Sequence, residues 1–218
     1  MNAFEHTISS ADELSNLYRA PTEGVVAKET STLDHGCREF INQSTFVLVG
    51  TSSSEGKQDV SPRGGPAGFV KVLDEHRLVI PDLNGNNRLD SIHNIIEQRT
   101  IGLLFVIPGL GETLRIKGQG CITTDNDILE LFSEKLRKPK AAIGVTVESG
   151  FIHCAKSFKR SGLWEPDTWP RKECTPSPGQ MLIDHSGMGE SMTGEELDHL
   201  LEAGYKVDLA ADLPETST

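Results

Sequence analysis

Short runs of apolar and β-branched residues recur through the middle of the chain and predict β-strands. TFVLVGTSS, residues 45–53, is the first of these runs. TIGLLFVIPG, residues 100–109, is nearly continuously apolar, which predicts a strand buried on both faces. The next run alternates apolar and polar residues and is expected to form a hairpin with it. The other predicted strands lie within residues 68–74, 77–82, 112–125 and 141–155.

Apolar residues at helical spacing predict helices between and around these strands. Ser10 with Glu13, and Thr193 with Glu196, have the S/T-x-x-E form of a capping box and mark two helix starts. Another helix, NRLDSIHNIIEQ, is predicted from four apolar residues on one face: Leu89, Ile92, Ile95 and Ile96. The predicted helices lie within residues 11–19, 32–44, 87–98, 127–136 and 195–205.

The order of these elements predicts the fold class. At least six strands within about 110 residues, joined mostly by short turns, indicate a mainly β (α+β) chain built on an antiparallel barrel with peripheral helices. A doubly wound parallel sheet would need a helix after nearly every strand. We expect an N-terminal helical segment packed on the barrel (1–44), the barrel (45–164), and an irregular tail with one short helix (165–218).

Composition and charge exclude several classes of function. The 218 residues carry a formal net charge of -11. Such a surface repels nucleic acids and anionic membranes, so neither is expected as a partner. No apolar run approaches the roughly 18 residues that a membrane span requires. The acidic N-terminus lacks the basic-then-apolar order of a secretory signal, so we expect a cytoplasmic protein.

The residues typical of catalytic and metal sites show no recognisable spacing. The four cysteines lie far apart without a C-x-x-C pair, which predicts reduced, mostly buried thiols. The seven histidines form no H-E-x-x-H pattern, and no serine lies in a G-x-S-x-G elbow. We expect no metal, and no catalytic side chain can be assigned. The chemistry of an enzyme of this kind would belong to a cofactor.

Arg63 lies in DVSPRGGPAGF, residues 59–69, where Pro and Gly surround a single cation. Two interpretations are open. The segment is a surface turn whose arginine points into water, or it is an anion site whose glycines let the backbone approach a ligand closely.

Arg88 lies where a predicted strand ends and a helix begins, in IPDLNGNNRLD. Gly85, Asn86 and Asn87 tolerate left-handed backbone conformations and would expose amides at the helix N-terminus. An arginine beside such amides is suited to phosphate. The alternative is that Asn87 only caps the helix and Arg88 is solvated.

A third group of cations stands near residue 160. Lys156, Lys159 and Arg160 are interleaved with Phe158 and Trp164. This segment either covers a flat aromatic ligand by stacking and anion pairing, or is a surface helix whose basic side chains cover apolar area. Arg115, in LRIKG, is mid-strand and faces either water or a polar cleft.

The order of these segments resembles that of the pyridoxamine 5'-phosphate oxidase-related, FMN-binding family, and within it a bacterial subfamily of about this length. The resemblance is carried by SPRGGP, LVIPDLNGNNRLDSIHNI, IGLLFVIPGLGETLRIKGQG and FIHCAKSFKRSGLW. It runs from about residue 32 to residue 164. It implies an antiparallel split β-barrel that forms a homodimer, with FMN in a groove at the subunit interface.

The resemblance also implies roles for individual residues. Arg63 and Arg88 would bind the FMN phosphate, with Asn86 and Asn87 as further donors. Two charge-assisted contacts of roughly 1.5–3 kcal/mol each would offset the repulsion of an acidic surface. The ring would lie against Ser61 and Pro62 and against the backbone of Val79, Ile80 and Pro81. The second subunit would supply Arg115, Lys156, Arg160 and Trp164.

These observations lead to three hypotheses. The first is an FMN-dependent oxidoreductase that acts on a small molecule, its flavin taking a hydride at N5. The second is a flavin- or haem-binding module of the same fold without turnover. The third is a small barrel that binds an anionic metabolite or a partner protein and no flavin. The acidic end YKVDLAADLPETST lacks the basic substrate segment of the true oxidase, which argues against pyridoxamine phosphate as substrate.

Overall fold

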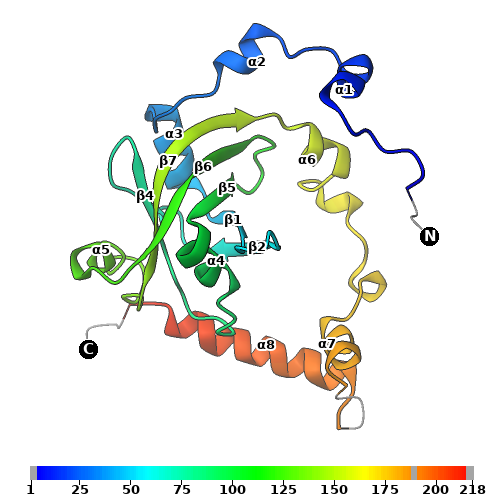
Figure 1. The fold of residues 1–218 in the computed structure, drawn as a ribbon. Helices are drawn as coiled ribbons and strands as arrows, with labels where there is room; N and C mark the ends of the chain where they lie inside the picture. The colour runs from blue at the N-terminus through cyan, green and yellow to red at the C-terminus, as the bar shows by residue number, and fades with distance from the viewer. Residues whose placement is uncertain (1–3, 188–190, 215–218) are drawn as a thin grey trace.

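The computed structural model describes residues 4–187 and 191–214. Its centre is a seven-stranded antiparallel sheet in the order β2-β1-β5-β6-β7-β4-β3, curved into an open barrel (Figure 1). The edge strands β2 and β3 do not pair with each other, so the barrel is split, as predicted. The strands are β1 (Phe46–Ser52), β2 (Gln58–Gly64), β3 (Lys71–Val72), β4 (Arg77–Pro81), β5 (Thr100–Val106), β6 (Thr113–Thr123) and β7 (Ala142–His153).

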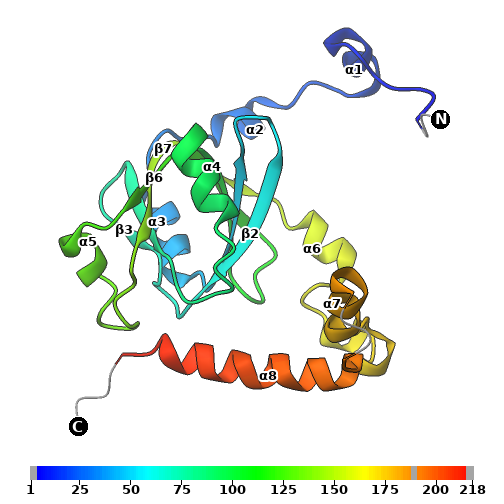
Figure 2. The same cartoon turned by 60° about the horizontal axis from the view of Figure 1, so that its bottom comes forward.

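Helices surround this barrel without forming a continuous layer (Figures 1 and 2). α3 and α4 each bury side chains against the sheet, whereas α1 and α2 bury none. The helices are α1 (Ala11–Leu17), α2 (Glu23–Ala27), α3 (His35–Gln43), α4 (Asp90–Gln98), α5 (Asn126–Glu130), α6 (Lys156–Ser161), α7 (Pro178–Ser186) and α8 (Gly194–Ala211), with 3-10 turns at Pro166–Thr168 and Lys172–Cys174. None of the described helices is both long and apolar enough to cross a membrane.

Side chains of β1, β2 and β5 alternate between an inner face, toward the core, and an outer face. In β1, Val47, Val49 and Thr51 are buried on the inner face, while Leu48 and Gly50 are half-buried on the outer face. Opposed residues of antiparallel strands point to the same face, so the register with β2 and β5 carries these two faces across the sheet.

The prediction that β5 is buried on both faces is only partly correct. Ile101, Leu103 and Phe105 are buried on the inner face. Gly102 and Leu104, on the outer face, remain half-exposed in the single chain. The predicted hairpin with β6 is confirmed, with Thr100 opposite Gln119 and Val106 opposite Thr113.

The predicted apolar face of α4 is wrong in two positions. Ile95 is buried, but Ile96 is 66% exposed and Leu89 lies at the N-cap, before the helix. Ser91 and Asn94 are buried instead. Both make side-chain hydrogen bonds to neighbouring strands, and these bonds compensate for the burial of their polar groups.

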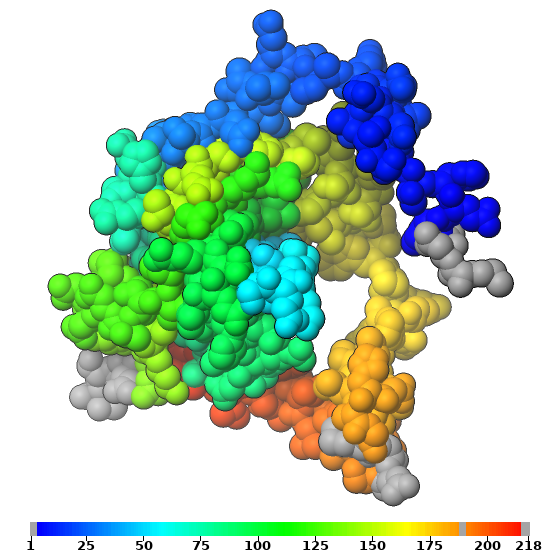
Figure 3. Space-filling view, in the orientation of Figure 1, coloured from blue at the N-terminus to red at the C-terminus, as the bar shows by residue number. Residues whose placement is uncertain are grey.

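The C-terminal segment is more regular than its Pro, Gly and Ser content predicts. α7 occupies residues expected to be irregular; Ser177 caps it and Pro178 takes its first position, where proline is favoured. α8 is longer than predicted, with the capping box of Thr193 and Glu196 in place. Between Trp164, which bonds to Leu110, and Asp212, which bonds to Asn84, this segment stands away from the barrel, and Figure 3 shows an opening between them.

The predicted burial of the cysteines is correct only for Cys37. That thiol is buried, and burial raises its pKa to about 11. Cys121, Cys154 and Cys174 are free and exposed. They lie on the outward side of β6, at the end of β7 and in the C-terminal segment, where a single chain offers no apolar cover.

Candidate functional site

Arg63 lies on β2, an edge strand, and not in the turn that one interpretation of its segment predicted. Asp59, Ser61 and Arg63 alternate along one side of β2 and are all half-buried. Arg63 is opposite Val47, which is fully buried, so both side chains lie on the inner face. Pro62 is tolerated because an edge strand leaves one row of backbone donors unused.

The guanidinium of Arg63 is only partly satisfied. Its Nη1 donates a hydrogen bond to Asp82 Oδ1 at 2.6 Å, and the two side chains are 19% and 22% exposed. Its Nε is buried and has no hydrogen-bond partner. Arginine carries five N–H donors, and a buried donor without an acceptor costs about 1–3 kcal/mol. Another acceptor is therefore favoured at this position.

The loop between β4 and α4, residues 82–89, carries the second predicted arginine. Its first residue is fixed by the Asp82 N–H, which donates to Ala141 O at 3.0 Å. Asn87 has a left-handed backbone with φ 57, as its residue type permits. Arg88 N donates to Asn86 Oδ1 at 3.0 Å, while the exposed Arg88 side chain pairs with Asp90.

This loop follows the inner side of β2 from one end to the other. Asp82 bonds to Arg63 near one end of the strand, and Ser91 Oγ donates to Asp59 Oδ2 at 2.6 Å near the other. Arg88 pairs with Asp90, whose neighbour Ser91 bonds to Asp59, so this cation lies near the Asp59 end of β2. Asp59 and Arg63 are ~13 Å apart at the usual rise of a strand. The two arginines thus border the stretch around Ser61 from opposite ends.

α4 is held over the inner face by a buried polar contact. Asn94 Nδ2 donates to Thr51 Oγ1 at 3.0 Å, and the two residues are 9% and 4% exposed. Together with the Ser91–Asp59 bond, this contact fixes the start of α4 and hence the end of the 82–89 loop.

Three of the predicted ring contacts lie on β4. Val79, Ile80 and Pro81 are buried and pair with β7 at Gly144, Ile143 and Ala142. β3 opposes β4 only at Leu78 and Val79, so the second backbone edge of Ile80 and Pro81 lies beyond that short ladder. Because their side chains are buried, these three residues could contact a flavin ring only through their backbone atoms.

Ser61 and Pro62 are neighbours on β2 and therefore point to opposite faces.

Arg115 lies on β6, three positions from β2 in the sheet, or ~14 Å at normal strand spacing. It is exposed and lies over the Phe151 ring at 5.7 Å, beside Lys28 and Lys117 at 5.2 and 5.9 Å. Arg115 and Arg63 are thus not brought together within one chain.

The segment from Lys156 to Trp164 is likewise separate from Arg63. Lys156 and Arg160 are exposed on α6. Trp164 packs edge-on against Phe158 at 5.7 Å and donates its Nε1–H to Leu110 O at 2.8 Å, in the β5–β6 turn. Within the described part of the chain, no hydrogen bond or ion pair joins this segment to β2 or to the 82–89 loop.

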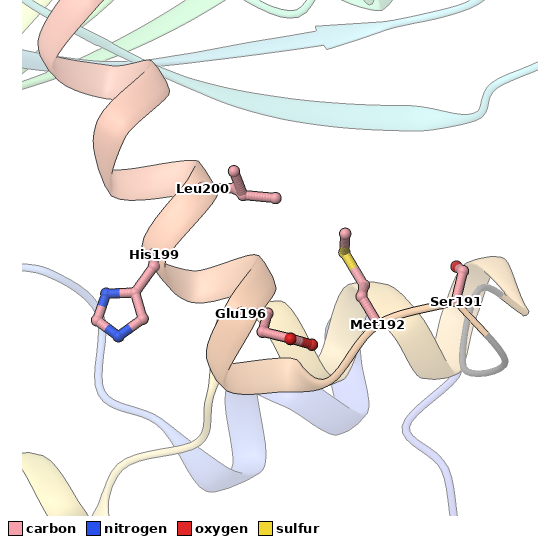
Figure 4. Close-up of a pocket in the computed structure, with 5 residues that line it drawn as sticks. All are labelled: Ser191, Met192, Glu196, His199 and Leu200. Atoms are coloured by element: carbon pink, nitrogen blue, oxygen red, sulfur yellow. The ribbon is translucent and has the colours of Figure 1, made fainter.

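A separate pocket of about 460 Å³ lies at the start of α8 (Figure 4). None of the predicted site residues lines it; its walls are Ser191, Met192, Glu196, His199 and Leu200. The Glu196 carboxylate is already engaged by the amide and hydroxyl of Thr193, which lower its pKa. This pocket therefore contributes no group to the site around β2.

Three residues of the site were not singled out by the sequence: Asp59, Asp82 and Ser91. A period-2 alternation of polar residues in QDVSPRG was the available signal for β2, but Pro and Gly obscured it.

Across the residues the structure describes, no three His, Cys, Asp or Glu side chains gather as a metal site would need.

Several solved structures are similar to part of this chain. Solved structures with a similar chain course include HupZ of Group A Streptococcus, at 19% identity over 55% of this chain and 92% of that one, with a TM-score of 0.45. A Lactobacillus delbrueckii protein, provisionally named pyridoxamine 5'-phosphate oxidase, matches at 19% identity over 56% and 95%, with a TM-score of 0.43. An FMN-binding protein of Syntrophomonas wolfei matches at 6% identity over 54% and 83%, with a TM-score of 0.41.

No curated protein sequence matches the chain. The family model described as pyridoxamine 5'-phosphate oxidase does match it, over residues 33–154. That match extends from just before α3 to the end of β7 and includes both arginines of the site. Because it spans more than half of the 218 residues, the chain belongs to the pyridoxamine 5'-phosphate oxidase family.

Proposed function

We propose that this protein binds FMN and works as an oxidoreductase on a small molecule. Family membership supports a flavin, and one observation carries the proposal for this chain: the buried, unpartnered Nε of Arg63. An arginine that only pointed into water would not bury an N–H donor without a hydrogen-bond partner. A dianionic phosphate beside β2 would accept that donor.

The residues around Ser61 fit such a phosphate. Arg63 offers its Nε, since Asp82 occupies only one of its N–H groups. Ser61 offers a hydroxyl between the two arginines, and Arg88 is exposed enough to exchange Asp90 for a phosphate oxygen. Each charge-assisted bond would contribute about 1.5–3 kcal/mol. Asn86 and Asn87 lie in the same loop and would supply further donors.

When bound, FMN would supply the two-electron chemistry, as a hydride acceptor at N5. The chain's own residues would then bind and orient it: the loop and β2 at the phosphate, and the backbone of Ile80 and Pro81 along the ring.

We further propose that two copies form a homodimer through the outer face of β2, β1 and β5. Apolar side chains are exposed there, including Val60 at 65% and Phe46 at 36%, beside the half-buried Leu48 and Leu104. A groove at that interface would receive Arg115 and the Lys156–Trp164 segment from the second copy.

A spectrum of the purified protein followed by an FMN titration tests the proposal. We expect a yellow protein, or a colourless one that quenches FMN fluorescence with saturation at one flavin per chain. Bleaching of bound flavin by NADH or NADPH, with reoxidation in air, would support turnover over passive binding. A colourless protein that leaves FMN fluorescence unchanged at every concentration would overturn the proposal.

A further inference from the structure

The C-terminal helix α8 contacts the rest of the chain near its two ends. At its start, Asp198 accepts hydrogen bonds from Gly179 N and Ser177 Oγ, both at 2.7 Å, which joins α8 to α7. Residues 202–210 are exposed. At its far end, Ala211 and Asp212 are again half-buried, where the helix meets the barrel (Figure 2). α8 therefore connects α7 to the barrel.

Asp212 makes two bonds at that meeting point. Its carbonyl oxygen accepts the Arg137 N–H at 2.7 Å. Its side-chain Oδ1 accepts the Asn84 N–H at 3.2 Å. Asn84 belongs to the loop of residues 82–89, so the carboxylate of Asp212 connects the C-cap of α8 to the loop that carries Arg88.

The bond between Asp212 and Asn84 lies just before the part of the loop that carries Asn86, Asn87 and Arg88. Asp82 is held by Ala141 and by Arg63, and Asn84 by Asp212. From Gly85 to Leu89, the described hydrogen bonds and ion pairs stay within the loop or reach α4, as the Asn86–Arg88 and Arg88–Asp90 contacts do. Asp212 thus provides the last external attachment before Asn86, Asn87 and Arg88.

We propose that Asp212 is a positioning residue for the flavin site and that α8 couples the C-terminal segment to that site. The inference rests on the proposed function, because it takes residues 86–88 as phosphate donors. By fixing the Asn84 amide, Asp212 restricts the conformations of the following residues before the ligand arrives. A loop held in its bound conformation loses less entropy on binding.

The coupling must act in both directions. If the Asp212–Asn84 bond strengthens FMN binding by some factor, FMN strengthens that bond by the same factor. Bound FMN should therefore slow hydrogen exchange at the Asn84 amide in the wild-type chain. It should have a smaller effect on that amide when the acceptor of Asp212 is removed.

Two substitutions separate the hydrogen bond from the charge. Asp212→Ala removes the acceptor, while Asp212→Asn keeps an acceptor oxygen and removes the charge. Both leave the backbone bond to Arg137 unaltered. Asp208→Ala is the matched control, an exposed acid one turn earlier on the same helix. If only the negative charge mattered, all three variants would bind the FMN phosphate more tightly. If the Asp212–Asn84 hydrogen bond matters, FMN binding should weaken in Asp212→Ala alone.

The experiment measures hydrogen exchange of residues 83–89 in the flavin-free protein, and FMN affinity by fluorescence, for the four chains. We expect exchange of the loop to be about fivefold to tenfold faster in Asp212→Ala, with a similar loss of FMN affinity, as for one lost hydrogen bond. Asp212→Asn and Asp208→Ala should behave as wild type. Equal exchange in all four chains would overturn the proposal. If the wild type binds no FMN, the proposed function fails, while the exchange comparison still decides whether Asp212 holds the loop.

Discussion

Arg63 of β2 donates a 2.6 Å hydrogen bond to Asp82, the first residue after β4. β2 is one edge of the sheet and β4 lies next to the other edge, so this ion pair spans the split of the barrel. Both side chains are largely buried, and the pair places a cation with a spare Nε donor at the point where the two ends of the sheet meet. A structural contact and a candidate ligand contact therefore share one guanidinium.

Removing this guanidinium should weaken FMN binding. We expect Arg63→Ala to lower the affinity at least about tenfold, and Arg63→Lys to lower it less, because lysine keeps a charge beside Asp82 but has no Nε donor. Arg88→Ala should also cost about tenfold. Titration of the flavin-free protein, followed by FMN fluorescence, measures all three.

Arg77→Ala is the control for these variants. Arg77, at the start of β4, is likewise paired with an aspartate, Asp74, but its side chain is 63% exposed. Its loss should leave FMN affinity unchanged. Unaltered affinity in both Arg63→Ala and Arg88→Ala would place the phosphate elsewhere.

The buried contact between Asn94 and Thr51 should contribute measurably to stability. Asn94→Ala leaves the Thr51 hydroxyl buried without its donor, so we expect the free energy of unfolding to fall by about 1–3 kcal/mol. The double variant Asn94→Leu with Thr51→Val removes both polar groups and should be closer to wild type than Asn94→Ala. Urea unfolding measures each; additive losses in the double variant would contradict a pairwise bond.

Elements defined by local pattern could be predicted from the sequence. β5 follows from a nearly continuous apolar run, and β6 from the alternation of apolar and polar residues; both patterns depend only on neighbours in the chain. β7 was likewise predicted as a strand from its own run of residues. α7 also carried a usable signal, Ser177 followed by Pro178, but the surrounding Gly and Pro residues obscured it.

The contacts that build the site could not be predicted in the same way. Arg63 and Asp82 are 19 residues apart, Asp59 and Ser91 are 32 apart, and Asn84 and Asp212 are 128 apart. Each depends on how the barrel closes, which no local period encodes. The face of α4 was mispredicted for a related reason: Ser91 and Asn94 are buried because strands supply their partners.

Gly118 should not tolerate a side chain. It lies at the bulge where β6 shifts register against β7, and a Cβ there would lie 2.1 Å from the carbonyl oxygen of Thr146. We expect Gly118→Ala to destabilise the protein by about 2–3 kcal/mol, since backbone must move. Gly204→Ala, on α8 with no atom within 4 Å of the new Cβ, should stabilise by up to about 1 kcal/mol. Thermal unfolding compares them, and equal melting temperatures would contradict the expected clash.

The proposed homodimer predicts an effect at Val60. Val60→Glu places a charge on the outer face of the edge strand and should shift the protein from dimer to monomer in light scattering after gel filtration. Leu73→Glu, at a 38% exposed leucine just beyond β3, should leave the mass unchanged. A monomeric wild type, or a dimeric Val60→Glu, would show that this face is not the interface.

The four cysteines should differ in reactivity. Burial raises the pKa of Cys37 to about 11 from its ordinary 9.0, so at pH 8 it is almost entirely protonated, whereas Cys121, Cys154 and Cys174 are exposed. We expect a thiol reagent to label these three and to reach Cys37 only on unfolding. The raised pKa also stabilises the fold below pH 9, and this contribution is lost as pH rises from 9 toward 11, because only the unfolded chain ionises there. Cys37→Ala should lack that alkaline loss in urea unfolding; an identical loss in Cys37→Ala would assign it to other groups.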